Sequence, residues 1–192
     1  MASEKLDRRV RKTRALLQRG LIQLMGDKDI KDISVKELSD LVDINRGTFY
    51  LHYSDIYDML HKIEDELFIE FNEILNRNFE ENPCVIPPKS VLMEVFSLLG
   101  KNRDMARVMI GPHGDMTFVN RLKGLVKERL ESLFLSQIYA PQQLEYYYPF
   151  IVSGCIGVIE TWLNSDNPKS PEEMAALCSD MISRGLTSLE IS

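Results

Sequence analysis

Four polar side chains with hydrogen-bonding chemistry lie near position 50 of this 192-residue chain. Phe49 and Tyr53 stand four residues apart, so on a short helix both would face inward. That arrangement leaves four residues pointing outward: Arg46, Thr48, Tyr50 and His52. A guanidinium, two hydroxyls and an imidazole can donate or accept hydrogen bonds on an exposed surface, which is the chemistry that reading a nucleic acid requires.

Two short helices and a tight turn would position this set within residues 34–53. Ser34 followed by Glu37 predicts a reciprocal capping box at a helix start. Apolar residues then recur at helical spacing, at Val35, Leu38, Leu41 and Val42. Asp43 tolerates the left-handed conformation of a sharp helix end, and Asn45 can cap the second helix. The segment therefore has the shape of a helix-turn-helix DNA reader.

The charge distribution supports this interpretation, although the whole chain carries a net charge of −6. Residues 1–53 are net positive by three, and residues 54–192 are net negative by nine. Six cations crowd one predicted helix start: Lys5, Arg8, Arg9, Arg11, Lys12 and Arg14. Beside a helix-turn-helix they are expected to grip phosphates, and a solvated face is the alternative.

The motif NRGTFYLHY, preceded by SVKELSDLVDI, resembles the DNA-binding region of the TetR (tetracycline-repressor) family of bacterial transcription regulators. The resemblance covers about Arg8 to Leu60. It implies that the second short helix enters the major groove of operator DNA in a homodimer, with Arg46 and Thr48 at base edges and Tyr50 and His52 at phosphates. The DNA-binding residues expected are Arg11, Lys12, Lys36, Asn45, Arg46, Gly47, Thr48, Tyr50 and His52. Val42 and Asp43 stand where the family usually has Ala and Gly, and Ile56 replaces a frequent phosphate-contacting Lys.

Helical periodicity continues through the chain and predicts an all-α fold of about nine helices. Expected helices cover about Asp7–Met25, a connecting helix 54–81 with Ser54 as N-cap, Val91–Lys101, Arg103–Ile110, Met116–Ser136, Gln142–Asn164 and an amphipathic helix after Ser170 and Pro171. Proline-rich residues 82–88 and the turn 110–115 would separate some of them. We expect a DNA-binding domain at 1–53 and a regulatory and dimerisation domain at 54–192.

The stretches MIGPHGDMTFVNRL, EYYYPFIVSGCIGVIETWL and SPEEMAAL resemble the C-terminal domain of TetR members similar to the dihydroxyacetone-kinase regulators of Gram-positive bacteria. This second resemblance covers about Met109 to Gly185. It implies a domain that dimerises and responds to an effector, and it leaves the effector open. Regulators of this type include activators as well as repressors.

Small and apolar residues in the second half suggest two sites. Small residues four apart allow close helix pairing, which favours a dimer interface at Ser153, Gly154, Gly157, Met181 and Leu186, with packing inside one chain as the alternative. Large apolar side chains, among them methionines that adapt to irregular shapes, could line an effector cavity beneath the connecting helix, or could fill the core: Met105, Met109, Met116, Phe118, Phe150 and Trp162. The run 146–148 of three tyrosines is expected to pack, or to stack on an aromatic effector.

Enzymatic and metal-binding interpretations find little support. Asp58 and His61 share a helix face, but no second helix offers a matching carboxylate and histidine, so we expect neither a metal nor a cofactor. No hydrolase, nucleotide or dinucleotide motif occurs, and His113 is interpreted as an exposed turn residue. Cys84, Cys155 and Cys178 are read as separate reduced thiols. No export signal or membrane span is recognisable, so a cytoplasmic protein is expected.

The sequence thus predicts a homodimeric TetR-type regulator of transcription, not an enzyme, that binds an inverted-repeat operator. Repression is the expected sign, with control by a small-molecule or protein effector at the C-terminal domain. The alternative is a helical interaction module whose C-terminal domain binds a partner protein.

Overall fold

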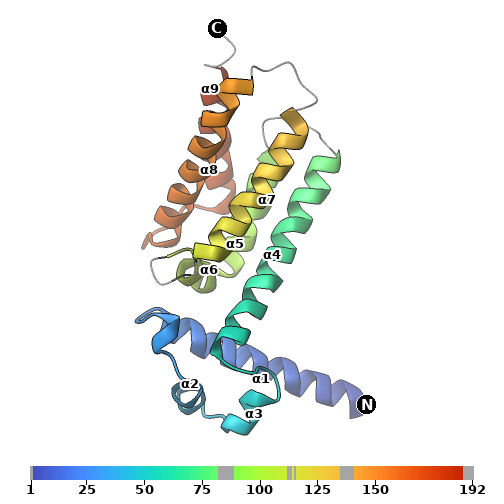
Figure 1. Cartoon of the computed structure of the whole chain (residues 1–192), viewed down its shortest axis with the longest axis vertical. Coiled ribbons are helices and arrows are strands. Elements are labelled where there is room, and N and C mark those ends of the chain that lie inside the picture. Colours follow the sequence, from blue (N-terminus) through green and yellow to red (C-terminus); the bar gives the residue numbers. More distant parts are fainter. Residues whose placement is uncertain (1, 82–88, 112–113, 115, 135–140, 188–192) are drawn as a thin grey trace. The chain divides into compact units, whose positions relative to one another are not determined.

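The computed structural model describes residues 2–81, 89–111, 114, 116–134 and 141–187 (Figure 1). This part of the chain contains α1 (Ala2–Met25), the 3-10 helix η1 (Ile30–Asp32), α2 (Val35–Leu41), α3 (Arg46–Tyr50), α4 (Ile56–Glu81), α5 (Lys89–Lys101), α6 (Arg103–Ile110), α7 (Met116–Phe134), α8 (Pro141–Leu163) and α9 (Pro171–Thr187). Nine α-helices and no strand among these residues confirm the predicted all-α fold.

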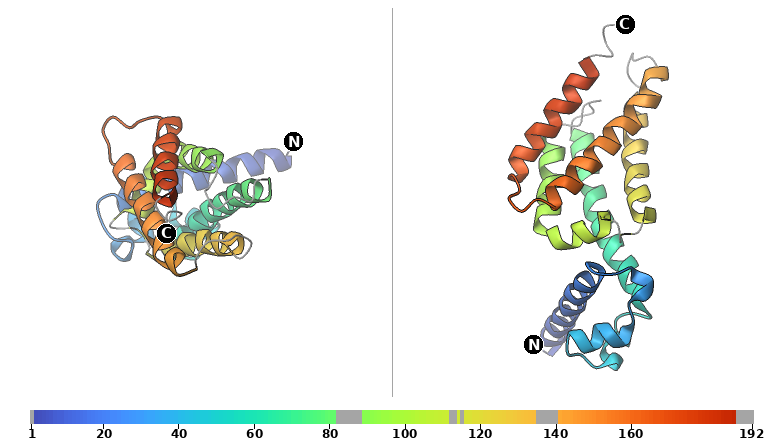
Figure 2. Two further views of the ribbon diagram at one scale, coloured as in Figure 1. Left: turned by 90° about the horizontal axis from the view of Figure 1, so that it is seen from above. Right: turned by 90° about the vertical axis from the view of Figure 1, so that its left-hand side faces the viewer.

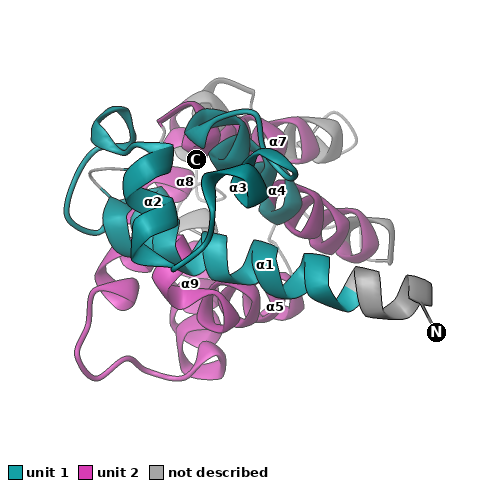
Figure 3. Ribbon diagram, turned by 90° about the horizontal axis from the view of Figure 1, so that it is seen from below, with its two compact units in different colours: residues 1–67, 108–115 teal, residues 68–107, 116–192 magenta. Residues whose placement is uncertain are grey.

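The helices form two compact units, coloured separately in Figure 3. The first comprises Met1–Leu67 with Val108–Asp115, and the second comprises Phe68–Arg107 with Met116–Ser192. Helix α4 begins in the first unit and continues into the second. The domain boundary expected after residue 53 lies inside the first unit and stays a prediction.

The turn between α2 and α3 has the conformation that its residues predict. Asp43 is left-handed at φ 53°, the only positive φ of a non-glycine residue in the described chain. The N–H of Ile44 donates to the carbonyl of Ser39 at 2.9 Å, which closes α2 with a Schellman-type hydrogen bond. Asn45 Oδ1 then accepts the N–H of Gly47 at 2.7 Å and caps α3. These local bonds fix the direction in which α3 leaves the turn.

Close packing of α1 on α2 depends on Gly20. A Cβ atom there would lie 2.4 Å from Val42 Cγ1 and 2.8 Å from Leu38 Cδ1, closer than atoms can approach. The missing side chain lets Val42 occupy a position where a smaller residue was expected from the family resemblance. Leu17, Leu21, Leu38 and Phe49 form the core beside this contact, each at most 1% exposed.

Two predicted caps need correction. Ser34 Oγ accepts the N–H of Glu37 at 3.1 Å, whereas the Glu37 carboxylate pairs with Lys28, so the predicted capping box is half formed. Asp55, and not Ser54, caps α4: Asp55 Oδ1 accepts the N–H of Asp58 at 2.8 Å. A carboxylate accepts from helix N–H groups more strongly than a hydroxyl because it carries the negative charge that the helix dipole favours.

The second unit is held together around α5, which packs chiefly against α9 (Figure 2). Phe96 of α5 meets Trp162 of α8 edge to face, with ring centroids 5.2 Å apart, and Trp162 Nε1 donates to the Lys169 carbonyl at 2.8 Å. Arg103 donates to the carbonyls of Leu163 and Ser165 and so caps the end of α8. Burying these rings with their polar groups satisfied stabilises the junction of three helices.

Helix α9 begins as predicted, with Ser170 as N-cap and Pro171 as the first helical residue. Ser170 and Glu173 exchange backbone-to-side-chain hydrogen bonds of 2.8 and 3.2 Å, a complete capping box. The bond from the N–H of Ser170 lowers the pKa of Glu173, because it stabilises the carboxylate.

Helix α1 begins at Ala2, five residues before the expected Asp7; the other boundaries agree to within two residues where they can be compared, and α6 agrees at both ends. The predicted loop 82–88 and His113 of the turn 110–115 lie outside the described residues. In the part of the chain that the structure describes, no helix combines the length and apolar character needed to cross a membrane.

Candidate nucleic-acid interface

Helix α3 presents one buried side and one exposed side. Phe49 is fully buried and Tyr53 is 5% exposed, as the spacing of the two rings predicts. Arg46 and Gly47 are exposed, Tyr50 is 57% exposed, and Thr48 and His52 are partly exposed. The outward set predicted from sequence is therefore available to a partner over the whole length of α3.

Asn45 and Gly47 shape the start of α3. Because the Asn45 side chain caps the helix, its oxygen is committed to the Gly47 N–H. A Cβ atom at residue 47 would lie 3.2 Å from that oxygen, so a larger residue would press on the cap. These two residues hold the backbone in place, and Arg46 and Thr48 supply exposed side-chain chemistry beside them.

The end of α3 is fixed by Tyr53, which sits between two cations. Arg14 of α1 donates from Nε to the Tyr53 hydroxyl at 3.3 Å, and this bond is the main reason why the pKa of Arg14 is raised. Lys62 of α4 lies over the same ring, with Nζ 5.3 Å from its centroid, and donates to the His52 carbonyl at 3.3 Å. Helices α1, α3 and α4 are thus tied together at one aromatic side chain.

His52 follows α3 within this network. Burial, and then the positive charge of Arg14, lower the pKa of its imidazole below the usual 6.5. A lowered pKa keeps the ring neutral in the free protein near pH 7. A neighbouring phosphate would act in the opposite direction and favour the imidazolium.

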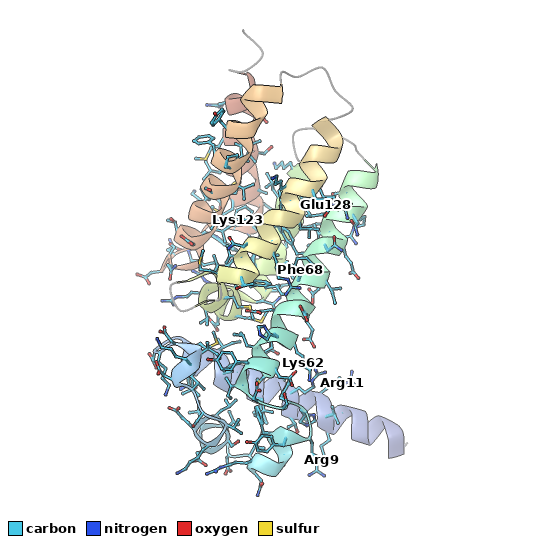
Figure 4. The ribbon with its side chains drawn as sticks, viewed as in Figure 1. Arg9, Arg11, Lys62, Phe68, Lys123 and Glu128 are labelled. Atoms are coloured by element: carbon cyan, nitrogen blue, oxygen red, sulfur yellow. The ribbon has the colours of Figure 1, made fainter. Side chains whose placement is uncertain are left out.

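The basic residues of α1 divide into two groups. Arg8, Arg9, Arg11 and Lys12 are exposed, and Figure 4 shows Arg9 and Arg11 on α1 and Lys62 on α4. Arg14 is less exposed; it donates to the Tyr53 hydroxyl and lies 3.7 Å from Glu66. The exposed group together with Lys36 of α2 supplies the cations expected for phosphate contacts.

Two further residues at this surface escaped sequence reasoning. Leu51 is 80% exposed, the most exposed of the large apolar residues identified, and directly follows α3. An apolar side chain in such a place can contact a thymine methyl group. Lys62 was missed because its closeness to His52 depends on how α4 folds back, although it lies only ten residues further along the chain.

Asp58 and His61, the residues weighed above as half of a metal site, make separate polar contacts. Asp58 accepts from Lys62 Nζ at 2.9 Å and from the Ser54 N–H, and the latter bond is the first cause of its lowered pKa. His61 Nδ1 lies 3.1 Å from the buried Glu64. Asp58 and His61 therefore turn to different partners.

The predicted effector residues differ in exposure. Met105, Met109, Phe118 and Trp162 are at most 8% exposed, whereas Met116 is 61% and Phe150 is 70% exposed. Trp162 packs on Phe96, as described above. An effector cavity lined by all six residues stays a prediction. Met116 and Phe150 could line a closed cavity only if a further element covered them.

The predicted dimer residues lie on an exposed face of α8 and α9. Ser153, Gly154 and Gly157 are exposed, Met181 is 54% exposed, and the side chain of Leu186 is outside the described part. A Cβ atom added at Gly154 or Gly157 would meet nothing within 4 Å. Three more large apolar side chains on these helices are exposed: Tyr146, Phe150 and Leu177.

Comparisons with known proteins find relatives among transcriptional regulators. Residues 88–184, half of the chain, match a TetR family model described as "Transcriptional regulator C-terminal region". A curated relative, the "Uncharacterized HTH-type transcriptional regulator YxbF" of Bacillus subtilis (strain 168), is 22% identical over 182 residues, 88% of this chain and 44% of the relative. The chain thus spans less than half the length of that relative.

Two solved structures share the fold. A TetR transcriptional regulator from Streptococcus agalactiae 2603V is 18% identical with a TM-score of 0.61, covering 94% of this chain and 98% of that one. The "Dihydroxyacetone kinase operon activator DhaS" is 15% identical with a TM-score of 0.58, covering 93% and 97%. The second likeness agrees with the resemblance noted in the C-terminal half.

Proposed function

Because this chain belongs to the TetR family of transcriptional regulators, we propose that it binds an inverted-repeat operator as a homodimer and represses transcription in the cytoplasm. The exposed side of α3 carries this proposal: Arg46, Thr48 and Tyr50 lie on the helix and His52 directly after it, between the fixed residues Asn45 and Tyr53. A helix whose backbone is already fixed can present side chains to base edges, because little backbone entropy is lost when it binds.

The exposed cations of α1 provide the second part of the interface. Arg11 and Lys12 would contact phosphates and contribute affinity without sequence preference. Leu51 would add an apolar contact beside the base-reading residues. Residues 54–192 carry the excess of acidic residues that makes the whole chain net negative.

The apolar face of α8 and α9 supports the homodimer. Phe150 and Met181 are more than half exposed on these helices. Gly154 and Gly157 leave open space that a neighbouring helix could enter. A twofold dimer would present two copies of α3, as an inverted repeat requires.

Effector control is proposed to act through α4, which runs from the DNA-reading unit into the second unit. An effector, a small molecule or a partner protein, that favours one position of this helix would change the spacing of the two copies of α3. DhaS is by its name an activator, so the sign of regulation needs a direct measurement.

Selection of genomic DNA fragments by the purified protein tests the proposal. Enriched fragments should share an inverted repeat, and the protein should reduce expression of a reporter placed behind that repeat. The matched control is Arg46→Ala, which should lose the enrichment and keep its fold. Absence of any enriched repeat would contradict sequence-specific DNA binding and favour the interaction-module alternative. A rise in reporter expression would contradict repression but leave operator binding in place.

A further inference from the structure

Two cations from different helices meet at the ring of Tyr53. Arg14 of α1 donates from Nε to the Tyr53 hydroxyl at 3.3 Å, and its guanidinium carbon lies 5.8 Å from the ring centroid. Lys62 of α4 places Nζ 5.3 Å from the same centroid. Neither residue is among the DNA-binding residues expected from the family resemblance. Their convergence is a property of the folded first unit, to which all three residues belong.

Both cations are accessible to a ligand from solvent. The Arg14 side chain is 42% exposed and the Lys62 side chain is 45% exposed. Tyr53 is only 5% exposed, so its ring is a buried support for the two cations. Arg11 stands three residues before Arg14 on the same side of α1 and is exposed as well. The cationic surface therefore extends from α1 past the end of α3 to α4.

The carboxylates beside these cations leave hydrogen-bonding capacity for a further anion. Glu66 lies 3.7 Å from Arg14 Nη2, beyond hydrogen-bond distance, and is itself 62% exposed, so this pair is weak in water. Asp58 accepts from Lys62 Nζ at 2.9 Å and also accepts a backbone N–H, which holds this carboxylate at the start of α4. An ammonium group has three N–H donors, and the two acceptors identified for Lys62 are Asp58 and the His52 carbonyl. A phosphate oxygen can therefore join these contacts without displacing Asp58.

The imidazole of His52 adds a third basic group at the end of α3. Its backbone carbonyl accepts from Lys62, and burial followed by the charge of Arg14 lowers the pKa of its ring. Cationic groups that converge on one place repel one another unless an anion lies among them. A DNA phosphate supplies such an anion, and its oxygens accept charge-assisted hydrogen bonds from guanidinium and ammonium groups.

We propose that Arg14 and Lys62, held at Tyr53, form a binding site for the DNA backbone at the end of α3, where they contact one phosphate or two adjacent phosphates of a single strand. This inference rests on the proposed function, because it names contacts of the DNA-binding surface. Tyr53 is a positioning residue: its hydroxyl fixes the Arg14 guanidinium through Nε, so less side-chain entropy is lost when the terminal nitrogens bind a phosphate. Because one cation comes from α1 and the other from α4, the bound backbone would join these two helices.

The test uses the full-length chain and the inverted repeat recovered by the selection experiment. The repeat is prepared as a set of duplexes that each carry one neutral methylphosphonate in place of a phosphate. For the wild-type chain, the substitutions that remove these contacts should weaken binding about tenfold, as expected for hydrogen bonds between charged groups. Arg14→Ala and Lys62→Ala should each become insensitive at one of these positions, and the two positions should be identical or adjacent. Each variant should also reduce the salt slope by about one unit.

Each variant has a matched control in the same unit. Arg19→Ala removes an exposed arginine of α1 whose Nε donates to a backbone carbonyl. Lys28→Ala removes a lysine that is paired with Glu37, as Lys62 is paired with a carboxylate. Both controls should keep the wild-type response at every phosphate. Circular dichroism shows whether each variant is folded.

Tyr53→Phe tests the positioning role of the hydroxyl. It should reduce the effect of the methylphosphonate at the position assigned to Arg14, less strongly than Arg14→Ala does. A hydroxyl that only stabilises the fold would instead weaken binding to all the duplexes alike.

Three results would overturn the shared site. Arg14→Ala and Lys62→Ala could keep the wild-type response at every phosphate, or could weaken binding to all duplexes alike, which would show that the side chains only stabilise the unit. The insensitive positions could also lie far apart, which would show two separate contacts. In each case the wild-type chain still binds the repeat, so the proposed function stands. A wild-type chain that binds no repeat would refute the proposed function and the site together.

Discussion

Arg46 is the residue whose removal separates sequence reading from general attraction to DNA. We predict that Arg46→Ala weakens binding to the operator by about 1–3 kcal/mol per half-site and relaxes base preference, because a guanidinium at a base edge discriminates between bases. Arg46 is exposed, so the protein should stay folded without its side chain. Fluorescence anisotropy with operator and scrambled DNA measures both effects.

Arg11→Ala is the comparison for Arg46→Ala. A phosphate contact gives affinity without sequence information, so Arg11→Ala should weaken binding to both DNAs alike and reduce the salt slope by about one unit. An equal loss on both DNAs for Arg46→Ala would instead assign Arg46 to the phosphates.

His52 gives operator binding a predicted pH dependence. In the free protein, burial and the charge of Arg14 lower the pKa of His52 below 6.5. In the complex, a DNA phosphate would raise the pKa of His52. The complex then binds more protons than the free protein, so affinity should increase as pH falls from about 7.5 to about 5.5. Titrations at constant ionic strength measure the slope, and His52→Gln should flatten it. An identical slope in His52→Gln would assign the protons to other groups.

At the scale of elements, α1 and α2 pack closely because Gly20 has no side chain where Val42 lies. Gly20→Ala should gain about 1 kcal/mol in helix propensity and lose about 1–3 kcal/mol through overpacking against Val42 Cγ1, so the net effect should be destabilising. Urea unfolding followed by circular dichroism, with hydrogen exchange of α2, measures the change.

The double variant Gly20→Ala with Val42→Ala tests the cause. Removing the Val42 methyl groups relieves the 2.4 Å contact and leaves the end of the Leu38 side chain to shift, so the two changes should couple favourably by roughly 1 kcal/mol or more. Additive effects would mean that the helices separate without strain at this point.

Local chemistry explains which elements the sequence could predict. The left-handed Asp43, the Asn45 cap and the Ser170 box depend on neighbours within five residues, and all three occur in the structure. The start of α4 was misplaced because Ser54 and Asp55 are both good caps and only the folded backbone selects one. Contacts between distant elements, such as Arg14 with Tyr53 or Arg103 with the Leu163 carbonyl, leave no periodic signal in the chain.

At the scale of the whole molecule, Gly157 distinguishes packing within one chain from packing between two. No atom lies within 4 Å of a Cβ added there, so Gly157→Leu should leave the single chain folded and obstruct the proposed α8 contact in the dimer. Sedimentation should show monomer, with a dissociation constant raised about tenfold or more, equivalent to about 1.4 kcal/mol.

Gly124→Leu is the matched control for Gly157→Leu. Gly124 lies on α7, is exposed, and likewise has nothing within 4 Å of an added Cβ. It should remain dimeric, since α7 is not part of the proposed interface. Dimers of equal strength in both variants would move the interface away from Gly157.

Helix α4 carries the last prediction, because it belongs to both units of the chain. If effector control passes through this helix, thermodynamic reciprocity requires that operator binding alter the part of α4 that lies in the second unit. Operator DNA should therefore change hydrogen exchange in residues 68–81, in addition to the protection expected at α3 and at the basic start of α1. Arg46→Ala, mixed with the same DNA at a concentration where it does not bind, supplies the control. Changes confined to residues 1–67 would show that the DNA-reading unit responds alone, and the route through α4 would have to be abandoned.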